Sequence, residues 1–198
     1  MPQVGAIVLA AGQSARFGEP KQLVRFRGHT LIDGAIAAAQ DANCRPIVVV
    51  TGSSAAKITR TLADADIIIQ KNPTYRHGIG TSIRAGVERL IDVAPKTEAV
   101  VLLVCDQPFV TGDVIRRLID QHWTSGKPIA ASEYSNTCGV PALFDRSCFT
   151  ELLQLGDRDG AKPIILRSLA RVSKVPFPEG EIDIDTPDDY ARLNAPVS

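Results

Sequence analysis

The stretch that decides the fold is Val4-Gly5-Ala6-Ile7-Val8-Leu9-Ala10, an apolar run near the start of the chain. It leads into the loop Ala11-Gly12-Gln13-Ser14-Ala15-Arg16-Phe17-Gly18-Glu19-Pro20-Lys21. A short apolar run that ends in a glycine loop is typical of a strand buried in a parallel sheet. In open α/β folds, ligands bind at the carboxyl edge of such a sheet. The start of the chain therefore predicts an α/β fold with a binding loop at residues 11–21.

Strand and helix patterns alternate after this loop. We expect strands at 46–51, 65–70 and 99–104. We expect helices at 31–42, from Ser53 or Ser54 to about 63, at 81–93, and from Thr111 to about 123. This rhythm predicts a mostly parallel sheet with helices on both faces.

The rhythm changes after residue 125. Segments 128–134 and 140–144 read as strands separated by a polar turn, which predicts a small antiparallel excursion in the C-terminal half. Helices are expected near 147–155 and 161–169, then a short strand at 181–184 and a last helix from Thr186. Because no repeat or low-complexity linker interrupts the chain, we expect one domain over 1–198.

Composition narrows the class of protein. The chain has 198 residues, and 22 Lys+Arg balance 22 Asp+Glu, so the formal net charge is zero. This balance argues against binding nucleic acid through its phosphates. No apolar run reaches the roughly 18–20 residues that span a bilayer, and no signal-peptide pattern opens the sequence, so we expect no membrane association. The cysteines form no CxxC pair, which favours free thiols in a reducing cytoplasm.

The loop at 11–21 has the chemistry of an anion site. Small residues at 10–12 allow a ligand close to the backbone, whose N–H groups can point at phosphate oxygens. Arg16 and Lys21 add positive charge. The Walker A pattern fails because Lys21 is followed by Gln22, and GxGxxG is absent. Pro20 predicts irregular backbone through Lys21. An ordinary turn with surface charges remains the alternative.

Two carboxylates follow expected strands. Asp106 follows the apolar segment 99–104, and Asp185 follows the segment 181–184. A carboxylate beside a phosphate loop is repulsive unless a cation lies between them, and Mg²⁺ is commonly held by one or two carboxylates plus substrate phosphates. Either aspartate could instead be a turn or capping residue. Asp188 and Asp189 suit the first turn of the last helix, and we interpret them as structural.

The middle of the chain carries a second candidate segment. Asn72-Pro73 indicates a loop, and Gly78 and Gly80 allow tight backbone geometry before a helix that begins near Thr81 or Ser82. The N-terminus of that helix can hold a phosphate or a base edge, although Ser82 could simply be a cap. We interpret His77 as a loop residue and Arg84 as a salt-bridge residue.

The sequence resembles the molybdopterin dinucleotide group of nucleotidyltransferases, and within it the molybdenum cofactor cytidylyltransferases. Six segments, in order, carry the resemblance: Leu9-Ala10-Ala11-Gly12 through Lys21; Asn72-Pro73 with Gly78-x-Gly80-x-Ser82-Ile83-Arg84-x-Gly86; Cys105-Asp106-Gln107-Pro108; Gly139-Val140-Pro141-Ala142-Leu143-Phe144; Gly156-Asp157-x-x-Gly160-Ala161-Lys162; and Asp183-Ile184-Asp185-Thr186-Pro187-Asp188-Asp189. They span nearly the whole chain.

The resemblance implies a three-layer, Rossmann-like nucleotidyltransferase fold and assigns roles to particular residues. Asp106 and Asp185 would bind Mg²⁺, and Lys21, Arg16 and Asp106 would be catalytic. The nucleotide would contact residues of the first two segments, namely Leu9, Ala10, Ala11, Gly12, Lys21, Asn72 and Ser82. The implied donor is CTP, the implied acceptor is the terminal phosphate of molybdopterin, and a molybdenum enzyme or its chaperone is a possible protein partner.

Three alternatives stay open. A guanylyltransferase of the same group usually carries Gly-Gly where this chain has Ala11-Gly12, and the extra methyl leaves less room for a purine. A nucleotidyltransferase for another small phosphate would fit the departures at Phe17, at Val140 and before Gly160. A non-catalytic binding or delivery module is the third alternative, and the joint presence of Lys21, Asp106 and Asp185 argues against it.

Overall fold

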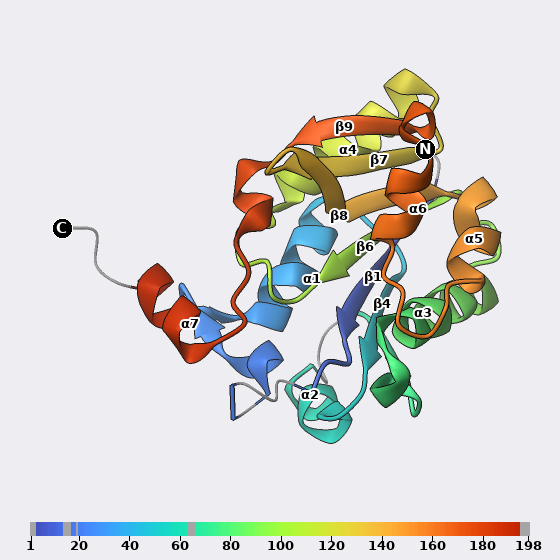
Figure 1. Ribbon diagram of the computed structural model, residues 1–198. Helices are drawn as coiled ribbons and strands as arrows, with labels where there is room; N and C mark the ends of the chain where they lie inside the picture. Colours follow the sequence, from blue (N-terminus) through green and yellow to red (C-terminus); the bar gives the residue numbers. More distant parts are fainter. Residues whose placement is uncertain (1–2, 14–16, 19, 63–65, 195–198) are drawn as a thin grey trace.

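The apolar run at the start of the chain forms β1 (Val4–Ala10), which lies inside a seven-stranded sheet (Figure 1). The computed structural model describes residues 3–13, 17–18, 20–62 and 66–194. Across the sheet the strand order is β5-β4-β1-β6-β8-β7-β9. Parallel pairing joins β1 to its neighbours and β4 to β5, with bounds β4 (Ile47–Thr51), β5 (Ile68–Lys71) and β6 (Ala99–Val104). The predicted parallel sheet is confirmed.

The antiparallel excursion is confirmed as well. The hairpin of β7 (Ile129–Tyr134) and β8 (Thr137–Asp145) places β8 antiparallel to both β6 and β7. A bulge interrupts the hairpin between Ala131 and Ser132. The edge strand β9 (Val172–Pro176) then runs parallel to β7.

Helices cover both faces of the sheet. One face carries α1 (Leu31–Asp41), α2 (Ala55–Thr61) and α4 (Gly112–Ser125), and the other carries α3 (Ile79–Val93), α5 (Phe149–Leu153) and α6 (Lys162–Arg167). Alternate residues of β1 explain this arrangement, because Ala6 and Val8 pack in one core cluster and Ile7 packs in the other. Both clusters are almost entirely apolar, as a strand buried on two faces requires.

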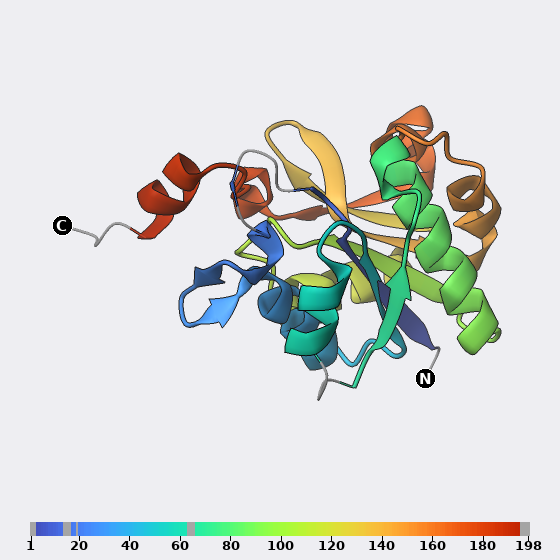
Figure 2. The same cartoon turned by 90° about the horizontal axis from the view of Figure 1, so that it is seen from below.

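A third, smaller cluster lies at one end of the molecule. It joins the hairpin of β2 (Arg25–Phe26) and β3 (His29–Thr30) to the C-terminal helix α7 (Pro187–Asn194). Figure 2 shows α7 and this hairpin together at the same end, outside the main layers. Ile184 is fully buried between them and contacts the cluster of Val24, Phe26 and Leu31.

The strand predicted at 181–184 is wrong. Residues Pro178–Glu181 form a 3₁₀ helix, and the chain then runs irregularly to α7. The alternation of Ile182 and Ile184 imitates a strand, but Ile184 is buried against the hairpin and α7 instead of in a sheet. The true last strand, β9, escaped notice because Ser173 and Lys174 interrupt its apolar pattern.

Helix starts were predicted with mixed success. Thr111 caps α4 by accepting from the Val114 N–H, as expected. Ser54 occupies the cap position of α2 without a side-chain cap bond, and Lys21 begins a 3₁₀ helix (Lys21–Leu23) where irregular backbone was predicted. The helix expected from about residue 81 begins at Ile79, after Gly78. Positions 63 and 65, where two element ends were expected, lie outside the described residues.

Among the helices of the described ranges, none is both long and apolar enough to cross a membrane.

Candidate active site

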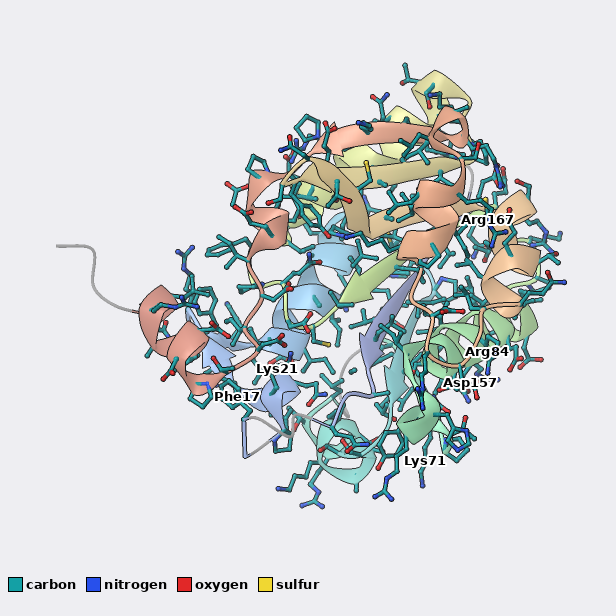
Figure 3. The ribbon with its side chains drawn as sticks, viewed as in Figure 1. Phe17, Lys21, Lys71, Arg84, Asp157 and Arg167 are labelled. Atoms are coloured by element: carbon teal, nitrogen blue, oxygen red, sulfur yellow. The ribbon has the colours of Figure 1, made fainter. Side chains whose placement is uncertain are left out.

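Three charged side chains from distant parts of the chain meet at the carboxyl edge of the sheet. Lys21 Nζ lies 2.9 Å from Asp106 Oδ2 and 2.7 Å from Asp185 Oδ1. Figure 3 shows Lys21 on the side of the molecule that faces α7. The side chains of Lys21, Asp106 and Asp185 are 15%, 28% and 41% exposed, so the group lies partly in solvent and partly in protein.

Backbone and side-chain contacts bring the two carboxylates together. Asp106 follows β6, and its carbonyl oxygen accepts a hydrogen bond of 2.9 Å from the Ile184 N–H. The neighbouring Gln107, only 6% exposed, donates through Nε2 to the carbonyl oxygens of Val140 and Gly180, at 3.1 and 2.7 Å. The segment that precedes Asp185 is therefore held against the end of β6. Asp185 reaches the site from irregular backbone and not, as predicted, from a strand.

Charge is concentrated around Lys21. Burial lowers the pKa of Lys21, but attraction to Asp106 and hydrogen bonds to Asp185 and Asp106 outweigh it, so the net pKa is raised. A third carboxylate, Asp183, has its pKa raised to about 6, first by loss of hydration and then by repulsion from Asp106 and Asp185. Asp183 nevertheless remains exposed as a whole residue. The sequence could have indicated Asp183 as a further carboxylate of the site, because Asp183 and Asp185 lie on either side of Ile184.

The donor set fits a hard divalent cation. Asp106 and Asp185 offer carboxylate oxygens, the ligands that Mg²⁺ prefers, and they already hold a positive charge between them. No cluster of three or more His, Cys, Asp or Glu side chains with metal-binding geometry occurs within residues 3–13, 17–18, 20–62 and 66–194. Further ligands would therefore come from water and from substrate phosphates, which is the usual pattern for Mg²⁺.

A cavity of about 200 Å³ adjoins Asp106. Five residues predicted to bind nucleotide or metal line it, namely Leu9, Ala11, Gly12, Ser82 and Asp106. The wall is completed by Gln13, Tyr75, Ile79 and Val104, which were not predicted to bind nucleotide or metal. Tyr75 and Ile79 carried no sequence signal for a binding site, because aromatic and apolar residues usually contribute to packing.

Two predicted nucleotide contacts lie behind this wall. Ala10 is 2% exposed, and its carbonyl oxygen accepts from Gln22 Nε2. Asn72 is also 2% exposed, and its Nδ2 donates to Thr81 Oγ1 and Ser82 Oγ at 2.8 and 3.0 Å. Asn72 therefore positions the start of α3, including Ser82, and does not itself line the cavity.

The glycine loop is held by side chains that the sequence analysis did not select. Gln22, which is 3% exposed, donates to the carbonyl oxygens of Ala10 and Gly12, and Ser53 Oγ donates to the Gly12 oxygen as well. These bonds engage carbonyl oxygens that would otherwise repel an anion. The predicted catalytic Arg16 lies outside the described residues.

The second segment packs against the Gly156–Gly160 loop. A Cβ at Gly80 would lie 2.0 Å from the Gly156 carbonyl oxygen, and one at Gly78 would lie 2.4 Å from that of Asp157. Arg84 bonds to the Leu155 carbonyl oxygen and lies 2.5 Å from Asp157, beside which Figure 3 shows it. The salt-bridge interpretation of Arg84 is confirmed. His77, 64% exposed in its side chain, lies 3.8 Å from the same carboxylate.

Comparisons with known proteins show the family to which the chain belongs. The family model described as "MobA-like NTP transferase domain" matches residues 6–173. The molybdenum cofactor cytidylyltransferase of Escherichia coli (strain K12) is 29% identical over 192 residues, which cover 96% of this chain and 95% of that protein. The probable molybdenum cofactor guanylyltransferase of Bacillus cytotoxicus is 27% identical over 202 residues, with 98% and 97% coverage.

A solved structure is similar over nearly its whole length. Rv0371c from Mycobacterium tuberculosis H37Rv superposes with a TM-score of 0.82 at 29% identity, and the match covers 97% of each chain. Its complex with manganese gives a TM-score of 0.75 over 98% of this chain and 100% of that chain.

A family model of nucleotidyltransferases thus matches most of the chain. The same chain has the sheet order, the lysine-carboxylate group and the adjoining cavity described above. The chain belongs to the MobA-like NTP transferase domain family. It is a nucleotidyltransferase, and its α/β fold is that of its structural neighbours.

Proposed function

We propose that this protein transfers CMP from CTP to the terminal phosphate of a molybdopterin-type acceptor and releases pyrophosphate. The observation that carries the proposal is the meeting of Lys21, Asp106 and Asp185 beside a cavity lined by the glycine loop. Full-length similarity to a molybdenum cofactor cytidylyltransferase supports the choice of donor and acceptor. Similarity to a probable guanylyltransferase makes GTP the second candidate donor.

The reaction is an in-line displacement at phosphorus. An oxygen of the acceptor phosphate forms a bond to the α-phosphorus of CTP, and the bond from that phosphorus to the α,β-bridging oxygen breaks. The electron pair of the broken bond leaves with pyrophosphate. Because the acceptor phosphate is already anionic near pH 7, no general base is needed. The chain has to supply positioning and charge stabilisation.

The candidate residues divide the work of this reaction among them. The loop around Gly12 would cradle the triphosphate, since its carbonyl oxygens are engaged by Gln22 and Ser53. Lys21, together with Arg16, would bind phosphate oxygens and stabilise the charge that develops on them. Asp106 and Asp185 would hold Mg²⁺, which when bound neutralises phosphate charge. The manganese complex of Rv0371c, a structural neighbour, supports the use of a divalent cation.

The cavity favours a small base. Ala11, Tyr75 and Ile79 belong to the wall of this cavity, whose volume is about 200 Å³. A pyrimidine makes the smaller demand on this space, which supports CTP over GTP. Ser82, held by Asn72, offers a hydroxyl group to the nucleotide.

We place the reaction in the cytoplasm, with a molybdenum enzyme or its chaperone as the recipient of the product. All four cysteines are free and buried, which suits a reducing compartment. Burial raises the pKa of Cys44 to about 12 and that of Cys148 to about 11, so these thiols are poor nucleophiles and act as core residues.

A matrix of substrates tests the proposal. CTP, GTP, ATP and UTP are each incubated with Mg²⁺ and with molybdopterin, its molybdenum-loaded form, or small sugar and alcohol phosphates, and pyrophosphate release is measured. We expect the highest kcat/KM for CTP with a molybdopterin acceptor. Preferential turnover of GTP would favour the guanylyltransferase, and turnover with sugar or alcohol phosphates alone would contradict the acceptor.

A further inference from the structure

The two carboxylates proposed to bind metal are already paired with one positively charged side chain of the protein itself. The Lys21 ammonium group contacts both Asp106 and Asp185, at 2.9 and 2.7 Å. Its side chain is the least exposed of the three, at 15%. Lys21 therefore lies within the carboxylate pair and not at its margin.

The position of Lys21 between the carboxylates conflicts both with metal binding by Asp106 and Asp185 and with triphosphate binding by Lys21. Mg²⁺ binds carboxylate oxygens at about 2.0–2.1 Å, so a metal ion between these aspartates would lie close to the ammonium nitrogen. The two cations would repel one another strongly in this partly buried site. Lys21 is also the residue proposed to bind the triphosphate, and one ammonium group cannot hold both carboxylates and phosphate oxygens at full strength.

An exchange of partners resolves the conflict. On the basis of the function proposed above, we propose that Lys21 is the displaceable counter-ion of the metal site, which leaves Asp106 and Asp185 when a metal–triphosphate complex binds. The ammonium group then moves to phosphate oxygens while the metal takes the carboxylates. A metal ion alone would have to compete with Lys21 for the two carboxylates. A metal ion bound to a triphosphate would bring phosphate oxygens, to which the Lys21 ammonium group could bind instead.

The surroundings of Lys21 allow this movement without a change of fold. Its four-carbon stem is flexible, and its backbone is fixed in the 3₁₀ helix that follows Pro20. The carbonyl oxygen of Lys21 accepts from the Val24 N–H, which anchors that turn. Asp106 belongs both to the ion-pair group and to the wall of the proposed nucleotide cavity, so the ammonium group of Lys21 starts beside that cavity.

Binding of Mn²⁺ tests the exchange independently of turnover. Free Mn²⁺ is measured by its electron paramagnetic resonance signal during titration of the full-length protein, with and without CTP and in the absence of acceptor. Without CTP, we expect Lys21→Met to bind Mn²⁺ at least about tenfold more tightly than the wild type, because a competing positive charge has been removed. With CTP present, we expect the wild type to gain Mn²⁺ affinity by a larger factor than Lys21→Met does.

Matched variants separate the possible failures. Lys57→Met removes an exposed lysine from α2 and should leave Mn²⁺ affinity unchanged. Lys21→Gln keeps a polar side chain and should behave as Lys21→Met does, which protects the test if one variant folds poorly by circular dichroism. Asp106→Asn in the Lys21→Met background should weaken Mn²⁺ binding.

The outcomes distinguish this inference from the function beneath it. Equal or weaker Mn²⁺ binding by both folded Lys21 variants, with a clear further loss when Asp106→Asn is added to Lys21→Met, overturns the counter-ion role and leaves the metal site standing. Unchanged Mn²⁺ binding when Asp106→Asn is added to Lys21→Met overturns the metal site itself, and the exchange with it.

Discussion

Asp106 joins two functions in one residue. Its side chain contacts Lys21, and its backbone carbonyl accepts from Ile184, one residue before Asp185. The geometry of the carboxylate pair therefore depends on the place of Asp106 at the end of β6 as well as on its charge. Replacement by asparagine separates the two contributions, because it keeps the shape and the backbone contact and removes the charge.

We expect Asp106→Asn to lower kcat/KM by roughly a thousandfold or more, since loss of a metal-holding carboxylate removes several kcal/mol of transition-state stabilisation. The melting temperature should change by only a few degrees, because the residue is not part of the apolar core. Pyrophosphate release and thermal unfolding provide the measurements. Asp188→Asn is the control, since Asp188 is exposed in the first turn of α7, and it should retain wild-type turnover. Near-normal rates in Asp106→Asn would contradict the assignment.

At the scale of the elements, α3 and the loop at residues 156–160 act as one unit. Gly78 and Gly80 come within van der Waals contact of this loop, Gly80 N donates to the Asp157 carbonyl oxygen at 2.9 Å, and Arg84 pairs with the Asp157 side chain. The Arg84 hydrogen bond holds the pKa of the Asp157 carboxyl below its usual value. Because Ile79 and Ser82 of α3 line the cavity, the contact with the loop sets the wall of the nucleotide site.

Two glycine-to-alanine substitutions in helices should have opposite effects. Gly80→Ala places a Cβ 2.0 Å from the Gly156 carbonyl oxygen, so we expect a loss of about 1–3 kcal/mol of unfolding free energy and a higher KM for the nucleotide. Gly34→Ala in α1 meets nothing within 4 Å and should stabilise the protein by about 0.5–1 kcal/mol. Urea unfolding and initial rates measure both effects. Equal stabilisation by the two substitutions would show that the loop does not pack on α3.

At the scale of the whole molecule, the C-terminal segment crosses from the β9 edge of the sheet to the hairpin and α7. Ile184 fills the small core there, with Val24, Phe26 and Leu31, and its N–H holds Asp106. Asp189 fixes the start of α7 by accepting from the N–H groups of Asp185 and Thr186. The position of Asp185 therefore depends on the packing of the hairpin and α7 as well as on the bond to the end of β6.

We expect Ile184→Ala to cost about 2–5 kcal/mol of unfolding free energy, because a fully buried side chain leaves a cavity. Below the unfolding transition, turnover should also fall, since the segment that carries Asp185 loses its anchor. Leu169→Ala, at a residue that is 50% exposed, should change stability by less than about 0.5 kcal/mol and leave turnover intact. Full activity of folded Ile184→Ala at low temperature would contradict this coupling.

The local pattern of apolar residues in the sequence was enough to predict the central strands and the parallel sheet. The runs at Val4–Ala10 and Ala99–Val104 are apolar throughout, and only a strand covered on both faces suits such runs, so β1, β6 and the parallel sheet followed from the sequence. Lys21 and Asp106 were found in the same way, because each follows a strand that ends at the ligand edge.

Tertiary structure decided the remainder. Asp185 reaches Asp106 because Ile184 is buried and its N–H group bonds to the Asp106 carbonyl oxygen. These two residues are 78 positions apart in the chain, and no sequence periodicity encodes such a bond. Gln22 and Asn72 likewise acquired their roles from hydrogen bonds that form only when their loops fold back on neighbouring segments, and Tyr75 acquired its role from its place in the cavity wall. Strand periodicity reports which face of an element is buried, whereas the partner that buries it is chosen only when the whole chain packs.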